Sequence, residues 1–189
     1  MNQLDWRWKI GEAIERLRTR YEFIGRKTGA PFLALVYPPA VEMTALKEWH
    51  TQTAALRPEM DVQTVDVLQV TQAVLADLGA EAVVDALRDP MPGADPQSEL
   101  GQLWVDAAAA ALRNAAQRSY TGKPVFCLER LAALYPAAGP RDLMRFLWDN
   151  AALACDAPIV ILIPGSLRGM RTYAFLDQKS EFMYRGDLL

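Results

Sequence analysis

The run Ile159-Val160-Ile161-Leu162-Ile163 is the strongest strand signal in this sequence, and Pro164-Gly165 follows it directly. Shorter apolar runs at Phe32–Tyr37 and at 125–128, and the valines of 62–68, predict three further strands. Continuous apolar runs of this length are typical of strands that are buried on both faces, as in a parallel sheet. The sequence therefore predicts a sheet at the centre of the molecule, with a final short strand near 172–175.

Helical patterns separate these runs. They cover 3–24, 40–56, 70–88 with an interruption at Gly79, 98–118 and 140–153. We expect inward-facing side chains that include Met43, Leu46, Trp49, Leu103, Leu143, Phe146, Leu147 and Ala151. Strands that alternate with helices indicate an α/β fold, because parallel strands need crossover connections. We expect a single three-layer α/β domain over 1–189, with a mostly parallel sheet of four to five strands, the helix of 1–24 packed on it and an internal loop at 89–97.

Composition excludes several classes of protein. The chain has 189 residues, and no stretch approaches the roughly 20 apolar residues of a membrane span. The first residues have no apolar signal core, which favours a cytoplasmic protein. The two cysteines, Cys127 and Cys155, and the single histidine, His50, cannot supply a zinc site and leave little room for triad chemistry. We expect no cofactor, no metal and no catalytic residue.

Charge is unevenly distributed along the chain. Residues 58–110 contain ten Asp or Glu and one base, Arg88, whereas the segments on either side each have three more bases than acids. Such an acidic segment disfavours contact with phosphates, and the sequence pI of about 5.2 agrees. It is either a solvated helical face or a docking surface for a basic partner.

The predicted layout is that of a P-loop protein, but the chain lacks a Walker A motif. The nearest match is the segment 25–29, Gly-Arg-Lys-Thr-Gly, which lies before the first strand and has the wrong spacing. A turn between helix and strand explains it. Glu129, at the end of an apolar strand, has the position of a Walker B acid, and without a phosphate loop this signal is weak.

The segment 165–169 is the most suggestive loop. It follows the strongest strand, and open α/β sheets bind ligands beyond the carboxyl ends of their strands. Ser166 is a conceivable nucleophile, but the order Gly-Ser-x-x-Gly differs from the Gly-x-Ser-x-Gly elbow. His50, its only possible histidine base, lies in a predicted helix and reads as a surface residue. A structural turn and a binding surface are the alternatives.

Cations and aromatics alternate near the C-terminus. The residues are Arg168, Arg171, Tyr173, Phe175, Lys179, Phe182, Tyr184 and Arg185. Such interleaving suits single-stranded nucleic acid or a protein interface. Of these two, the acidic pI favours a protein interface over nucleic-acid binding. Trp6, Trp8 and Trp49 are expected to pack within the fold.

Residues 125–136, which read Val-Phe-Cys-Leu-Glu-Arg-Leu-Ala-Ala-Leu-Tyr-Pro, resemble the BrxB family of BREX phage-defence systems. In that family an apolar strand leads into a Leu-Tyr-Pro turn, then a helix, then a strand that ends in Pro-Gly. This chain has the same order, with 33–38 in the place of the family's first strand, and the tail 182–185 (Phe-Met-Tyr-Arg) is similar to the family's C-terminal signature. One departure is the sequence Ser-Leu-Arg after Gly165, where the family often has an acidic or tyrosine-bearing loop.

The resemblance implies a non-catalytic adaptor of a BREX anti-phage complex, with a PglZ-type protein as the expected direct partner. The candidate interaction surface consists of Tyr135, Pro136, Gly165, Ser166, Arg168, Gly169, Tyr184 and Arg185. Tyr135 could equally be a core residue whose hydroxyl is satisfied. The alternative function is a nucleotide-binding or hydrolysing enzyme that uses Glu129 and Ser166 at the strand ends. A third is nucleic-acid binding by the basic, aromatic C-terminal stretch.

Overall fold

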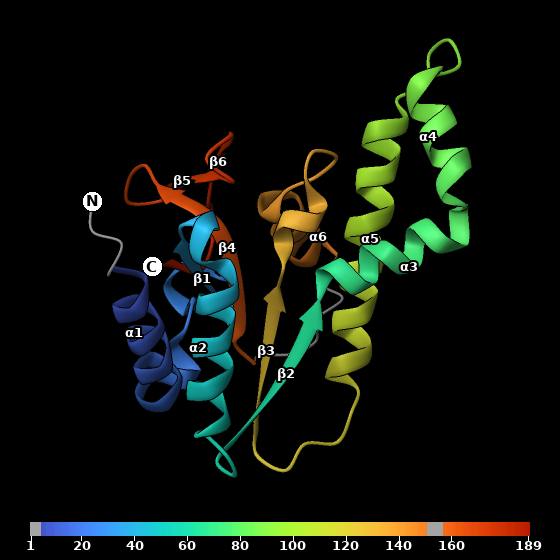
Figure 1. Ribbon diagram of the computed structural model, residues 1–189. Coiled ribbons are helices and arrows are strands. Elements are labelled where there is room, and N and C mark those ends of the chain that lie inside the picture. The colour runs from blue at the N-terminus through green and yellow to red at the C-terminus, as the bar shows by residue number, and fades with distance from the viewer. Residues whose placement is uncertain (1–4, 151–156) are drawn as a thin grey trace.

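A parallel sheet lies between two helical layers in the computed structural model, which describes residues 5–150 and 157–189 (Figure 1). Its strands lie in the order β2–β3–β4–β1–β7, and every adjacent pair is parallel. They are β1 (Phe32–Tyr37), β2 (Met60–Asp66), β3 (Lys123–Glu129), β4 (Ile159–Leu167) and β7 (Asp187–Leu188). The predicted three-layer α/β fold with a mostly parallel sheet is therefore confirmed.

The two faces of the sheet are covered by different helices. On one face lie α1 (Asp5–Arg20) and α2 (Glu42–Ala54), and on the other lie α3 (Val67–Leu78), α5 (Pro96–Ala116) and α6 (Pro140–Asp149). In β1, Leu33 and Leu35 pack in the first core, whereas Ala34 and Val36 pack in the second. Side chains of a strand alternate between faces, so burial of both faces explains the continuous apolar run. Short 3₁₀ helices occur at Tyr21–Phe23, Arg26–Thr28, Pro39–Val41 and η4 (Leu131–Leu134).

Strand β4 is longer than the sequence predicts. It continues through Pro164 and Gly165 to Leu167, and its last residues pair antiparallel with β5 (Thr172–Phe175), which pairs with β6 (Lys179–Phe182). The prediction of a loop beginning at Gly165 is wrong. A Cβ at Gly165 would lie 2.1 Å from the carbonyl oxygen of Ala174, so glycine serves here to bring two strands together.

Helix boundaries differ from the prediction at the start of α3 and at the start of α5. Val67 and Leu68 begin α3 instead of ending a strand, because the Asp66 carboxylate accepts hydrogen bonds from the backbone N–H groups of Leu68 and Gln69, at 3.1 and 3.3 Å. Helix α5 begins at Pro96, inside the loop predicted at 89–97, since proline suits the first turn and the Asp95 carboxylate accepts from the Ser98 N–H.

Several predicted inward-facing side chains are confirmed, and others are not. Leu46, Trp49, Leu143, Leu147 and Trp6 are buried. Met43 is 76% exposed, and Leu103 and Trp8 are also exposed. Ala151, Cys155 and the ends of the helices predicted at 3–24 and 140–153 include positions outside the described residues.

One part of the molecule projects away from the sheet. Helix α4 (Ala80–Arg88) follows α3 after an 84° bend at Gly79, whose φ is 82°, and lies beside the first half of α5 (Figure 1). We call residues 77–106 the acidic arm. No single helix in the described residues is long and apolar enough to cross a membrane, and α3 and α4 pass that test only as a bent pair.

Candidate functional site

The tail segment 182–185 lies against α6, and the two enclose a hollow of about 320 Å³. Six of the residues that line it form what we call the arginine–aromatic surface: Arg141, Arg145 and Trp148 from α6, and Phe182, Tyr184 and Arg185 from the tail. The three residues of α6 follow one another at four- and three-residue steps, which places them on one face of the helix. The opposite face carries the buried Leu143 and Leu147.

Cations and rings stack on each other across this surface. The guanidinium of Arg185 lies 3.9 Å from the ring centroid of Trp148, and that of Arg141 lies 5.2 Å from the ring of Tyr184. A nitrogen of Arg141 also donates to the Tyr184 hydroxyl at 3.4 Å, and the rings of Phe182 and Tyr184 pack edge to face at 4.9 Å. These contacts connect the tail to α6 and leave Tyr184 66% exposed.

A buried carboxylate, Glu181, fixes the β5–β6 hairpin on the N-terminus of α6. It accepts hydrogen bonds from the backbone N–H of Arg141 at 3.0 Å and from the Tyr173 hydroxyl at 2.8 Å, and Lys179 Nζ lies 3.2 Å from its other oxygen. Negative charge is favourable at a helix N-terminus. A Cβ at Gly139 would lie 2.1 Å from Glu181 Oε1, so this approach requires glycine.

Glu181 shifts the pKa values of the two titratable side chains that it contacts, Tyr173 and Lys179. Burial, and then the charge of Glu181, raise the pKa of Tyr173 above its ordinary value. Burial alone would lower the pKa of Lys179, but Glu181 and Asp142 outweigh it and raise that pKa. The buried Glu181 carboxylate thus lies between the neutral hydroxyl of Tyr173 and the cation of Lys179.

Backbone contacts fix the rest of the tail. The Arg171 guanidinium donates to the carbonyl oxygens of Met183, at 2.8 Å, and Gly186, at 3.2 Å. The N–H of Gly186 donates to Thr28 Oγ1 at 2.6 Å, so the segment predicted as a turn at 25–29 supports the tail. Met183 is buried, whereas its neighbours Phe182 and Tyr184 are exposed. The alternation presents both rings outward.

The predicted surface residues lie in three separate places. Tyr184 and Arg185 belong to the arginine–aromatic surface. Tyr135 and Pro136 are exposed after η4, where the Tyr135 ring meets Phe175 edge to face at 6.4 Å. Of the 165–169 segment, Arg168 and Gly169 are exposed in the β4–β5 turn, whereas Gly165 is buried and the Ser166 hydroxyl oxygen is buried without a hydrogen-bond partner in the described structure.

Sequence reasoning missed the α6 half of the arginine–aromatic surface. Arg141 and Trp148 lie about forty positions before the tail in the chain, so no local pattern joins them. The one available signal is the occurrence of Arg141, Arg145 and Trp148 on the polar side of a predicted amphipathic helix.

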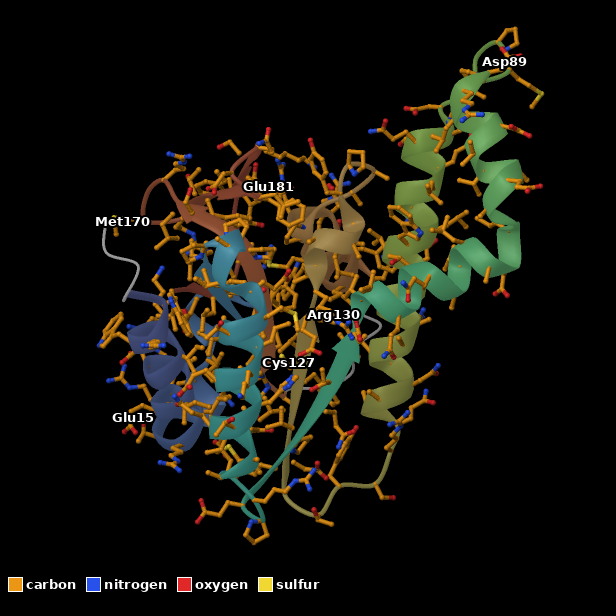
Figure 2. The ribbon with its side chains drawn as sticks, in the orientation of Figure 1. Glu15, Asp89, Cys127, Arg130, Met170 and Glu181 are labelled. Carbon is orange, nitrogen blue, oxygen red and sulfur yellow. The ribbon has the colours of Figure 1, made fainter. Side chains whose placement is uncertain are left out.

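A second site lies at the carboxyl end of the sheet. Glu129, the last residue of β3, is buried, and its Oε2 lies 2.7 Å from Nε2 of His50 on α2. The next residue, Arg130 (Figure 2), has a left-handed backbone with φ of 56°. It forms an ion pair with Asp66 at the end of β2. Glu129, His50, Arg130 and Lys47 border an open hollow of about 500 Å³, which we call the strand-end pocket.

The predicted pair of Glu129 and Ser166 does not form. Leu128 is in register with Ile161, so Glu129 is level with Leu162. Ser166 lies four residues further along β4, roughly 13 Å at about 3.3 Å per residue. His50 is exposed on α2, as predicted, and it lies beside Glu129 although 79 positions separate the two residues. Burial, and then Glu129, raise the pKa of the Cys127 thiol on the same strand.

Neither a metal-ligating group among the described residues nor a known relative marks a site. Within residues 5–150 and 157–189, no three His, Cys, Asp or Glu side chains form a group that could hold a metal ion. No protein-family model matches the chain, and no curated protein or solved structure is significantly similar to it. The chemistry of the two sites is therefore what supports a function.

Proposed function

We propose that this chain is a non-catalytic adaptor that binds a partner protein through the arginine–aromatic surface. The observation that carries the proposal is the group of exposed rings, Trp148, Phe182 and Tyr184, interleaved with three arginines around one hollow. Trp, Tyr and Arg are the residue types that contribute most free energy at protein interfaces. A hollow among such side chains suits an inserted side chain of the partner.

The surface is held in place before any partner binds. Glu181 fixes the hairpin on α6, and Arg171 and Thr28 fix the tail through its backbone. Association loses less conformational entropy when the interface side chains are already ordered. This arrangement supports recognition by a preformed surface.

Charge indicates the chemistry of the partner. Three arginines line the hollow, and Asp149 is the only acid that joins them among the described lining residues. A segment with acidic side chains would therefore complement the surface. This preference does not extend to a charged polymer of phosphates, because the chain as a whole has a net charge of −3.

The resemblance to the BrxB family supplies the class of partner for this proposal. Tyr184 and Arg185 belong both to the tail that resembles the family and to the surface described above. The adaptor would act in a cytoplasmic BREX anti-phage complex and bind a PglZ-type protein directly.

Affinity purification of the tagged chain from its host tests this proposal. We expect stoichiometric recovery of a PglZ-type protein, and a loss of at least about tenfold with Arg185→Glu, the size that a central interface arginine gives. The matched control is Arg18→Glu on α1, which makes the same charge change at an exposed position on the other face of the sheet. Equal recovery with both variants, or recovery of the chain alone, would contradict the adaptor.

A second candidate function rests on the strand-end pocket. Open α/β sheets bind ligands at the carboxyl ends of their strands. This pocket combines the buried Glu129 and the exposed His50 with the cations Lys47 and Arg130. The ligand to test is a nucleotide with Mg²⁺. The thermal unfolding midpoint is measured for the wild type and for Glu129→Gln, with ATP and with GTP. A ligand at a hundred times its Kd adds about 2.7 kcal/mol to stability, so an unchanged midpoint would remove this candidate.

A further inference from the structure

Helix α4 is amphipathic, but none of its residues is buried. Its apolar side includes Val84 and Leu87, which are each 42% exposed. Isolated helices of this length are not stable in water and depend on packing of the apolar face. Here α5 covers that face only in part, because Leu78 and Leu103 at its borders are exposed as well.

A groove runs between α4 and α5. It has a volume of about 260 Å³, and its lining is mainly apolar, with Val83, Leu87, Leu100 and Leu103 among its residues. A groove between two helices that is lined by Leu and Val is the form in which proteins bind the apolar stripe of a third helix. The shape of the arm thus fits a helix of a partner.

The arm that carries this groove is strongly acidic, and one of its carboxylates, Glu99, lines the groove itself. Residues 77–106 contain seven carboxylates, Asp77, Glu81, Asp85, Asp89, Asp95, Glu99 and Asp106, and one base, Arg88. No ion pair joins any of the seven to a described Lys or Arg. Six of them are exposed, and Asp89 lies at the far tip of the arm (Figure 2).

We propose that the acidic arm docks a basic amphipathic helix of a partner protein. Its apolar stripe lies in the α4–α5 groove, and its Lys and Arg side chains pair with Glu99 and with the other exposed carboxylates of the arm. The site is distinct from the arginine–aromatic surface and has the opposite charge, so the chain carries two surfaces for two different kinds of partner.

Charge also selects this occupant over the alternatives. A second copy of the chain would bring two arms of the same negative sign together, and like charges across an interface cost affinity. Nucleic acid and anionic lipid surfaces are repelled for the same reason. A basic helix is the occupant that gains from both the apolar groove and the negative charge of the arm.

The test is a titration of the full chain with a fluorescent designed peptide of about 18 residues, five helical turns of Leu and Lys with all Leu on one face. A peptide with Glu in place of Lys is the control probe. We expect the Lys peptide to bind and the Glu peptide not to bind, with an affinity that falls as salt rises because surface charges are screened. Equal affinity for the two peptides, or no binding of either, overturns the proposal.

Leu87→Asp separates docking from simple charge attraction. The variant makes the arm more negative, so attraction by charge alone would strengthen, whereas loss of the groove weakens binding by about tenfold, as expected for an apolar anchor. Met170→Asp, at a 95% exposed position far from the arm, adds the same charge as a control. An affinity for Leu87→Asp equal to or above that for Met170→Asp overturns the proposal.

A third variant separates this inference from the proposed function. Arg185→Glu removes a cation from the arginine–aromatic surface and leaves the arm intact, so we expect unchanged peptide affinity together with lost recovery of the adaptor's partner. Sedimentation of the wild type and of Leu87→Asp measures whether a second copy of the chain occupies the groove. A dimer that dissociates on this substitution would give the groove to a second copy and overturn the proposal.

Discussion

Strand β1 and helix α4 are both rich in apolar residues, and the molecule uses them in opposite ways. All six residues of β1 are buried between the two helical layers, whereas none of the nine residues of α4 is buried. Apolar area removed from water stabilises the fold by about 25 cal/mol per Å². Area left exposed on α4 gives the fold nothing, but it is available to a partner. Hydrophobicity in the sheet therefore serves stability, and in the arm it is available for the recognition that we propose.

The two regions should differ most in the free energy of unfolding that is lost when an apolar side chain is truncated to alanine. Ile161→Ala, at a fully buried position of β4, should lower the free energy of unfolding by about 2–5 kcal/mol, because it removes buried methylenes and leaves a cavity. Leu87→Ala in α4 should lower it by less than about 1 kcal/mol, since that side chain is already partly in water. Urea denaturation measures both. Equal losses would mean that the arm is part of the cooperative core.

Buried and exposed carboxylates give the second comparison. Glu181→Ala should destabilise the fold by about 2–3 kcal/mol, because it leaves the Tyr173 hydroxyl and the Arg141 N–H without their acceptor. It should also weaken partner binding, since the hairpin no longer holds Tyr184 beside Arg141. The control is Glu81→Ala on the exposed side of α4, for which a comparable loss would contradict the anchoring role of Glu181.

Alkaline pH tests burial within the sheet. The folded-state pKa of Cys127 is raised, so the unfolded chain releases the thiol proton first. The contribution of this thiol to the free energy of unfolding is therefore fully present below about pH 8.5. It falls as the pH rises, by about 1.4 kcal/mol for each pH unit above the unfolded-state pKa. Cys127→Ala should flatten this slope between about pH 8.5 and 10, before the tyrosines begin to ionise. Urea midpoints across that range give the slope, and a slope unchanged by the substitution would contradict the prediction.

The smallest expected effect concerns repulsion within the arm. Asp85→Asn removes one of the seven carboxylates of the arm and should raise stability by about 0.3 kcal/mol, in the range of like-charge pairs on helices. The gain should vanish at high salt. Thermal unfolding at low and high salt measures it, and a loss of stability at low salt would show that Asp85 has a favourable contact in the fold.

The fold class follows from the sequence because it rests on local signals. Burial of both faces gives each central strand a continuous apolar run, and this identifies β1, β3 and the first part of β4. The extension of β4 past Pro164 does not follow, since proline and glycine ordinarily end a strand and only the distant β5 reveals the pairing. β7 has two residues and no pattern of its own.

The candidate sites follow from the sequence only in part. Tyr184 and Arg185 stand out as a basic, aromatic tail, but their partners Arg141 and Trp148 come from a helix some forty residues earlier. The contact of His50 with Glu129 depends on α2 crossing the end of β3. Charge counting finds the acidic segment, whereas its projection from the sheet depends on the bend at Gly79. Contacts between residues that are distant in the sequence depend on the tertiary structure, so no local sequence pattern reveals them.

The position of β1 in the sheet has a consequence for the order in which the molecule can form. This strand is synthesised first, but its neighbours β4 and β7 come from residues 159–167 and 187–188. During synthesis the apolar run Phe32–Tyr37 therefore leaves the ribosome well before any strand can pair with it. Contacts of such high sequence separation form slowly and expose apolar surface to aggregation. We expect the nascent chain to depend on chaperones until its last thirty residues emerge.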